Sequence, residues 1–349
     1  MDGLVLEYRD PLFGIIVLFT LIFVISFLTY SYSMYREKKA RREYRKLFKR
    51  FELGKLKEED YVHLYKTYNL PFDSIILLAS TFLHKGDYTK AISVYLTLLE
   101  HVNDNVKKEE LLELLGSTYF RGGFLQRSKD IFLKILKFSP RNKHALTYLL
   151  ITYEKLKDYD KAYEVIESLE ELRVNISKEK KYINSMQIIN NPINSFEKKC
   201  SQLVELLNND NFIQRVVAQY LLQFNKTIFW NNIELFDTSI LMDMLWYLSF
   251  EDIDFDAVSK DKLLSELYTA KGYINDATNS ETFEINILIM LQKNKNHNQA
   301  DLNFEFICKK CKNIFPIYEN RCPHCHEILS FQIEPEITKN YIEENQSLQ

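Results

Sequence analysis

Glycine and proline are scarce in this sequence of 349 residues. It has 8 glycines, where average usage would give roughly 24, and only 7 prolines. Glycine-rich nucleotide-binding loops and sandwiches of short strands depend on such residues, so the composition disfavours both. Hydrophobic residues make up 46% of the chain and charged residues 27%, which is enough apolar material for a buried core. The composition therefore favours long helices joined by short connections.

Several classes of protein function are disfavoured because the sequence lacks the residues or motifs that they require. The 5 cysteines are too few and too clustered for a secreted disulfide framework. A formal net charge of −3 gives no global reason to expect nucleic-acid binding. The sequence also has no glycine-rich phosphate loop and no nucleophile with an evident base, so we do not expect an enzyme.

A long uncharged stretch lies near the N-terminus. No charged residue occurs from Leu12 to Tyr35, and about 20 apolar helical residues cross a bilayer core of about 30 Å. A signal peptide would have a shorter apolar region with positive charge before it, whereas residues 1–10 carry a net charge of −2. We expect residues 12–35 to form an uncleaved transmembrane helix, with residues 1–11 as a short extracytoplasmic lead.

A strongly basic segment follows the apolar stretch. Residues 36–50 contain nine Lys or Arg and two Glu, a net charge of +7. Removing this segment and the −2 of residues 1–10 from the total of −3 leaves −8 for residues 51–349. The positive-inside rule then predicts a cytoplasmic location for the bulk of the chain. We expect a basic juxtamembrane helical segment at residues 36–70, which acts as a stop-transfer signal and can also contact anionic lipid head groups.

A repeat with a period near 34 residues comes next. Each unit has the pattern Gly-x-Tyr/Leu-x-x-Ala/Ser, with Lys157 in place of glycine in the third unit. Small residues at this spacing let two antiparallel helices approach, and upstream aromatic residues fill the space between them. The pattern resembles the tetratricopeptide repeat family, with three repeats in residues 71–173. The register is carried by Gly86, Tyr88, Ala91, Gly123, Leu125, Ser128, Tyr159 and Ala162, and by the upstream aromatics Phe82, Tyr119 and Tyr153.

The first helix of each repeat is expected to line a concave binding face. The inward positions are a mixture of apolar and acidic residues, so we expect a protein partner with an apolar or basic segment. The predicted partner-binding groove consists of Asp73, Ile76, Ser80, Leu83, Glu110, Glu113, Ser117, Phe120, His144, Thr147, Ile151 and Glu154.

Residues 174–303 keep helical periodicity but lose the repeat register. Apolar residues recur at the i, i+3, i+4 and i+7 positions of amphipathic helices, as in Leu203, Leu207 and the run after Val216. We expect divergent helical hairpins that continue the solenoid. Trp230 and Trp246 are predicted to be packing residues, and Cys200 a small buried hydrophobic residue.

Residues 304–331 carry two Cys-x-x-Cys pairs separated by ten residues. Two residues between thiols allow one tight turn to direct both sulfurs at a single metal ion, and two such turns complete a tetrahedral shell of four sulfurs. We predict that Cys308, Cys311, Cys322 and Cys325 bind Zn²⁺ in a structural role, with iron as the alternative. His324 and His326 are expected to be exposed, and residues 332–349 to form a tail.

The second pair, Cys-Pro-x-Cys, makes this segment resemble a rubredoxin-like ribbon. So short a segment cannot bury much surface, so metal binding should supply much of its folding free energy. Its apolar side chains exceed what a free ribbon needs, which predicts docking onto the helical body. These side chains are Phe304, Phe306, Ile314, Phe315, Ile317 and Phe331.

The order of these parts resembles the lipopolysaccharide assembly protein B family of Gram-negative bacteria. The resemblance implies an all-α protein with a single transmembrane helix, a tetratricopeptide solenoid and a small zinc ribbon. It also implies a non-enzymatic adaptor of the inner membrane, which presents the deacetylase that commits lipid A synthesis to the membrane-bound AAA+ protease FtsH. The sequence departs from the family in its middle repeats, and at Lys312 and His326, which stand where glycine follows each Cys pair.

Two other functions remain open on the sequence alone. A general scaffold for an envelope, secretion or motility complex would use the same solenoid. A ribbon that bound iron would indicate a redox protein instead.

Overall fold

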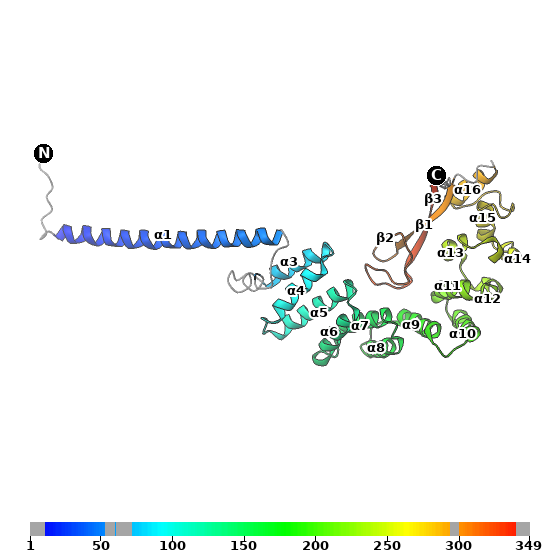
Figure 1. The fold of residues 1–349 in the computed structure, drawn as a ribbon, viewed down its shortest axis with the longest axis horizontal. Coiled ribbons are helices and arrows are strands. Elements are labelled where there is room, and N and C mark those ends of the chain that lie inside the picture. Colours follow the sequence, from blue (N-terminus) through cyan, green and yellow to red (C-terminus); the bar gives the residue numbers. More distant parts are fainter. Residues whose placement is uncertain (1–10, 53–59, 61–71, 294–299, 340–349) are drawn as a thin grey trace, which may run out of the picture. The chain divides into compact units, whose positions relative to one another are not determined.

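The computed structural model describes residues 11–52, 60, 72–293 and 300–339. Residues 1–10 of the expected lead at 1–11, the segments 53–59 and 61–70 of the basic region, residue 71, and the end of the tail at 340–349 lie outside the described residues. The described chain is mostly helical with a small sheet near its C-terminal end, which confirms the predicted fold class (Figure 1). It divides into two compact units, residues 1–131 and 132–349.

Helix α1 (Pro11–Glu52) is continuous from the apolar stretch into the basic segment. Within it, Val17–Lys39 is long and apolar enough to span a membrane, and its side chains are not buried by other parts of the protein. The hydroxyls of Thr20 and Thr29 donate to the carbonyls of Val17 and Ile25, both at 2.9 Å. These bonds satisfy the hydroxyls within the helix itself, as an apolar surrounding requires.

The first unit contains antiparallel helices packed around small residues. These are α3 (Phe72–His84), α4 (Tyr88–Leu99), α5 (Asn105–Arg121) and the start of α6 (Leu125–Phe138). Tyr95, Leu98, Leu111 and Leu115 form the centre of its core. The Ser128 hydroxyl donates to the Gly116 carbonyl at 2.9 Å, a contact that only a small residue on each helix allows.

The turns within the three repeats share one geometry. Gly86, Gly123 and Lys157 all have positive φ, at 75°, 78° and 60°. The next amide donates back to the carbonyl of the upstream aromatic residue in each case, at 2.9 Å for Phe82, 2.8 Å for Tyr119 and 3.0 Å for Tyr153. This is the hydrogen bond that closes a helix at a left-handed residue, which explains the glycine preference at this position.

The second unit begins with regular helices and continues with shorter ones. Both tryptophans and Cys200 are buried, as predicted. The helices are α7 (Lys143–Lys155), α8 (Tyr159–Glu171), α9 (Ser177–Asn190), α10 (Phe196–Asn209), α11 (Gln214–Phe224), α12 (Lys226–Asn231), α13 (Met242–Trp246), α14 (Phe255–Val258), α15 (Lys262–Ala270) and α16 (Phe283–Lys293). Four 3₁₀ turns lie between them: η1 (Asn211–Ile213), η2 (Ile233–Leu235), η3 (Thr238–Leu241) and η4 (Phe250–Asp252).

A three-stranded antiparallel sheet completes this unit, in the order β2-β1-β3. Its strands are β1 (Ala300–Cys308), β2 (Ile314–Phe315) and β3 (Phe331–Lys339). The ribbon is thus longer than expected, because β1 starts before residue 304 and β3 takes up the first part of the predicted tail. Nine residue pairs join β1 and β3, from Ala300 with Lys339 to Cys308 with Phe331.

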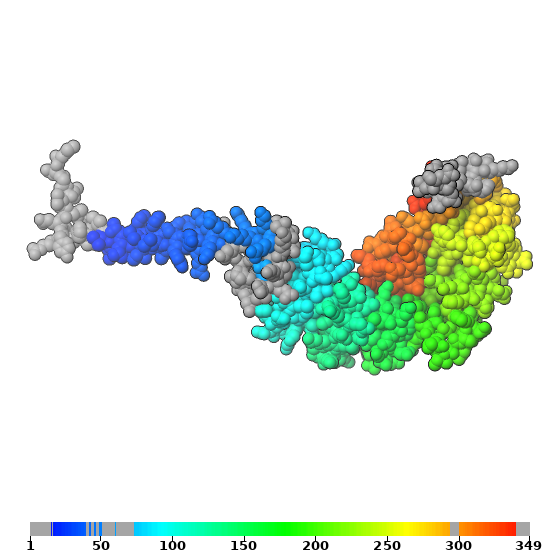
Figure 2. Space-filling model, viewed as in Figure 1, coloured from blue at the N-terminus to red at the C-terminus, as the bar shows by residue number. Residues whose placement is uncertain are grey.

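The ribbon and the helices of this unit share one hydrophobic core. Leu302, Phe304 and Phe306 alternate along β1 and are buried in the same cluster as residues of α10 to α16. Figure 2 shows the ribbon atoms in orange directly against helical atoms in green and yellow. The predicted docking is confirmed for Phe304, Phe306 and Phe331, and Phe315 packs partly buried against the same core, whereas Ile314 and Ile317 remain exposed.

Candidate metal centre and its contacts with the repeats

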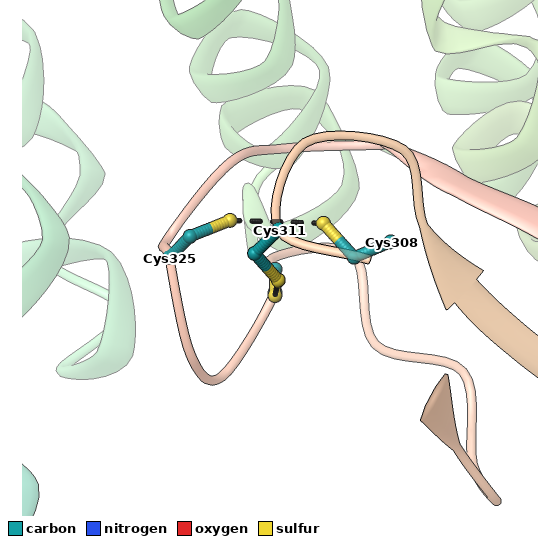
Figure 3. Close-up of side chains that lie close together, drawn as sticks. Cys308, Cys311 and Cys325 are labelled. Carbon is teal, nitrogen blue, oxygen red and sulfur yellow. Dashed lines mark hydrogen bonds between the residues drawn. The ribbon is translucent and has the colours of Figure 1, made fainter. Parts of the chain in front are cut away.

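The four predicted cysteines meet at one end of the sheet, and Figure 3 shows Cys308, Cys311 and Cys325 with their sulfurs directed toward one another. Cys308 ends β1, Cys311 lies in the turn after it, and Cys322 and Cys325 lie in the turn before β3. Their sulfurs all lie within 4.8 Å of one another, with Cys308 Sγ 3.6 Å from Cys325 Sγ and Cys311 Sγ 3.7 Å from Cys322 Sγ. Zn–S bonds of about 2.3 Å in a tetrahedron give sulfur–sulfur edges of about 3.8 Å. The four sulfurs therefore fit one metal ion.

Two turns of the same construction present these sulfurs. The amide of Lys312 donates to the Cys308 carbonyl at 2.8 Å, and the amide of His326 donates to the Cys322 carbonyl at 3.0 Å. Lys312 and His326 then have φ of 61° and 60°, in the left-handed region that glycine adopts most easily. Both residues thus adopt the backbone conformation that glycine takes most easily.

The electrostatics of the cluster favour a bound cation. Burial would raise the pKa of the Cys308 thiol, but hydrogen bonds from the amides of Cys311 and Lys310 and from the Ser330 hydroxyl hold it at about 6. Burial raises the pKa of Cys322 and Cys325. Four thiolates this close together cannot all ionise without a compensating positive charge, and a divalent metal ion supplies it.

This donor set determines what the centre can do chemically. Four sulfurs complete a tetrahedral shell around Zn²⁺ or iron, so no position is left for water or substrate. A closed site of this kind stabilises the fold around it, and hydrolysis at the metal has no place to occur. His324, which is exposed, is not needed as a ligand.

A buried ion pair joins the second cysteine turn to the third repeat. Arg321 Nε donates to Glu154 Oε2 of α7 at 2.8 Å, and Arg321 Nη2 lies 2.5 Å from the same oxygen. Only 5% of the arginine side chain and 7% of the glutamate side chain are exposed. Arg321 Nη1 also donates to the His326 carbonyl at 2.7 Å. One guanidinium therefore connects the backbone of the metal-binding turn with a repeat helix.

Further contacts surround this ion pair. The ring of His326 packs edge-on against Tyr148 of α7 with centroids 5.7 Å apart. His326 is therefore partly buried, and the prediction that it is exposed was wrong. Lys155 and Glu319 form a more exposed pair at 3.4 Å. The Arg321 guanidinium also lies 6.0 Å from the ring centroid of Tyr182 in α9.

A second buried ion pair reaches the ribbon from the helices. Arg215 of α11 donates to both carboxylate oxygens of Asp243 in α13, at 2.8 and 2.5 Å. The guanidinium lies 3.6 Å from the ring centroid of Tyr318 in the ribbon. Burial raises the pKa of Tyr318 to about 12, although the nearby Arg215 acts in the opposite direction. Asp301 of β1 accepts a further hydrogen bond from Trp246 Nε1 at 3.1 Å.

The structure places the predicted groove residues in two groups. In the first and second repeats, Asp73 and Glu110 are exposed, while Ile76, Ser80, Leu83, Glu113, Ser117 and Phe120 are partly exposed. In the third repeat, His144 and Thr147 are exposed but Ile151 and Glu154 are buried. These last two are not open to a separate partner in this structure, because Ile151 lies in the interior and Arg321 covers Glu154.

No pattern in the sequence predicts which residues hold the ribbon in place. Arg321 stands next to a metal ligand in the sequence, so its place in the cysteine turn could be predicted. Nothing in the sequence indicates its partner Glu154, which lies 167 positions earlier. Arg215 and Asp243 lie on helices without a repeat register, and nothing in their spacing points to Tyr318.

Comparisons with known proteins support the repeat assignment. A family model for the tetratricopeptide repeat matches residues 74–109. A tetratricopeptide repeat-containing protein of Methanocaldococcus jannaschii is 32% identical over 114 residues, which cover 32% of this chain and 20% of that protein. The match thus spans about one fifth of the relative's length. Tetratricopeptide repeats are protein–protein interaction modules, so this chain contains an interaction scaffold, and no catalytic family is found among these matches.

Proposed function

We propose that this protein is a membrane-anchored cytoplasmic adaptor of the lipopolysaccharide assembly type. In this function the tetratricopeptide groove binds protein partners, and the anchor holds them at the bacterial inner membrane. The client is the deacetylase of lipid A synthesis, which the adaptor presents to the membrane-bound AAA+ protease FtsH. The observation that carries the proposal is the combination of spanning helix, repeats and four-cysteine ribbon in one chain.

The continuous helix α1 supports the membrane part of the proposal. Its candidate span of 23 residues, Val17–Lys39, is about 35 Å long at 1.5 Å per residue, which matches a bilayer core of about 30 Å. Exposed basic residues follow on the same helix, among them Arg42, Arg45, Lys49 and Arg50. Positive charge on this side favours a cytoplasmic location for everything after the span.

The open part of the groove supports a protein client. In the first two repeats, exposed acidic residues stand beside partly exposed apolar ones, as in Glu110 and Phe120. A partner segment with apolar and basic side chains would match both kinds of contact. In the third repeat the ribbon takes the place of such a segment, which leaves α3 and α5 as the proposed client site.

Co-purification from membranes tests the proposal. The full chain carrying an affinity tag is extracted with a mild detergent, and bound proteins are identified by mass spectrometry. We expect both the FtsH protease and the lipid A deacetylase with the wild-type chain. The deacetylase should be lost with Glu110→Lys and retained with Lys178→Glu, an exposed position on α9 outside the predicted groove. Recovery of neither protein would reject the adaptor function.

The general scaffold is the second candidate, and it rests on the same repeats. It predicts a different set of co-purified proteins, drawn from an envelope, secretion or motility complex. The redox function depends on iron in the four-cysteine site. Metal analysis separates it from the others, because zinc has no visible absorbance and does not change oxidation state.

A further inference from the structure

The second cysteine turn directly contacts the groove face of the third repeat. Arg321 immediately precedes Cys322 and pairs across a local β-bridge with Ile328, so its backbone is part of the turn. Its side chain bonds the His326 carbonyl inside that turn and Glu154 on α7 at once. Any rearrangement of the turn therefore moves the guanidinium relative to Glu154.

A metal ion bound by the four cysteines would constrain the shape of that turn. His326 has a left-handed backbone conformation, which is unfavourable for a residue with a side chain. Metal–sulfur bonds to Cys322 and Cys325, which both precede it in the turn, would help to hold it there, because metal binding is coupled to the folding of the segment that carries the ligands. Without the ion, the turn loses the constraint that directs Arg321 at Glu154.

Glu154, on the groove side of this contact, needs the Arg321 guanidinium of the ribbon as its charge partner. Glu154 is buried, and a buried carboxylate without a cation is unfavourable. Release of Arg321 would therefore also favour opening of the face that Glu154 shares with Tyr148 and Tyr182, since both rings contact the same turn.

We propose that Arg321 couples metal occupancy of the four-cysteine site to closure of the third-repeat groove, so that the metal-loaded ribbon covers the Glu154 face and the metal-free ribbon releases it. This regulation rests on the proposed function, in which the groove binds clients. Because coupling between two sites is reciprocal, the ion pair must also contribute to metal affinity. Arg321 is a positioning residue, since its contacts in the described part of the chain go to Glu154, the His326 carbonyl and the Tyr182 ring.

Metal removal from the wild-type chain is the first test. Amide hydrogen exchange is measured on the full chain in detergent, loaded with zinc and after treatment with a zinc chelator. We expect faster exchange in α7 and α9 after zinc removal and an unchanged rate in α4, which belongs to the other compact unit. Equal exchange in α7 with and without zinc would overturn the coupling, even if co-purification identified the expected clients.

Zinc affinity of variants is the second test, measured by competition with a chromogenic chelator. Residues of the outer shell around a metal site typically contribute about 10- to 100-fold in affinity, and Arg321 belongs to that shell through its hydrogen bond to the His326 carbonyl, next to Cys325. We expect a loss of that size for Arg321→Ala and for Glu154→Gln. The double variant should bind zinc no more weakly than the weaker-binding of the two single variants, because the two side chains act as a unit.

A matched control separates the buried pair from general surface charge. Lys155→Gln breaks the exposed pair with Glu319, on the same helix and the same ribbon, and it should change zinc affinity less than twofold. Single variants within twofold of wild type, or losses that multiply in the double variant, would overturn the proposal. If Arg321→Ala does not fold, Arg321→Lys replaces it, since lysine keeps the charge and loses the two-sided contact.

Discussion

The pair of Arg215 and Asp243 predicts how strongly the helices of the second unit depend on one buried charge. In Arg215→Ala, Asp243 keeps its buried position and loses both hydrogen bonds from the guanidinium. Breaking a buried ion pair in this way typically costs about 3–5 kcal/mol, because the remaining charge has no partner. Tyr318 also loses the cation stacked on its ring, which contributes on the order of 1 kcal/mol. We therefore expect a decrease of about 4–6 kcal/mol in the free energy of unfolding.

Urea unfolding of the zinc-loaded chain in detergent, followed by far-ultraviolet circular dichroism, measures this change. The control is Lys226→Ala, which removes an ion pair with Asp252 at 2.8 Å whose side chains are both about one-third exposed. Its expected effect is below about 1 kcal/mol.

A double variant tests the physical reason for the loss. In Arg215→Met with Asp243→Leu, neither charge is buried without a partner, so much of the lost stability should return. A loss below about 1 kcal/mol in Arg215→Ala, or a double variant less stable than the single one, would refute the reasoning.

Three further predictions concern the metal site, a buried phenol and the anchor. Cys322→Ser should abolish stoichiometric zinc binding while the protein stays in the membrane fraction, and unchanged zinc content by atomic emission would contradict the ligand assignment. Tyr95 is buried, its hydroxyl has no hydrogen-bond partner among the described residues, and burial raises its pKa to about 12. Tyr95→Phe should therefore increase stability by about 1 kcal/mol. The folded state holds this proton more tightly than the unfolded state, where the pKa is about 10. Wild-type stability should thus fall between these pH values more steeply than that of the variant in urea titrations, and equal slopes would argue against a buried phenol. Deletion of residues 1–35 should move the protein from carbonate-washed membranes to the soluble fraction, and retention in the pellet would contradict an anchor at α1.

The parts of the fold that depend on local pattern were predictable from the sequence. Ala91, Ser128 and Ala162 have no exposed surface, since a side chain larger than these would separate the two helices of a repeat. The alignment of Lys157 with two glycines was equally informative, because all three residues adopt the same left-handed turn. The grouping of the four cysteines was predictable from their spacing alone, because two residues between thiols restrict both sulfurs to one side of a turn.

The contacts between distant segments were not predictable, because no local pattern encodes them. Glu154 occupies a position that faces inward on a repeat helix, and the expectation of an open groove followed from that periodicity alone. Its actual partner, Arg321, comes from a segment with no repeat register. The length of β3 was missed for a related reason. Gln332, Glu334 and Glu336 read as a polar tail, yet pairing with β1 makes this segment a strand.

The two buried arginines show why the ribbon is an integral part of the second unit. A ribbon held only by apolar contacts could dock in several orientations, because hydrophobic burial is not directional. Arg321 points from the ribbon to the helices, and Arg215 points from the helices to the ribbon. Each must find a partner at a fixed distance and angle, or a charge is buried without compensation. The two pairs together therefore select one orientation of the ribbon, and any change in the second cysteine turn must act on the third repeat as well.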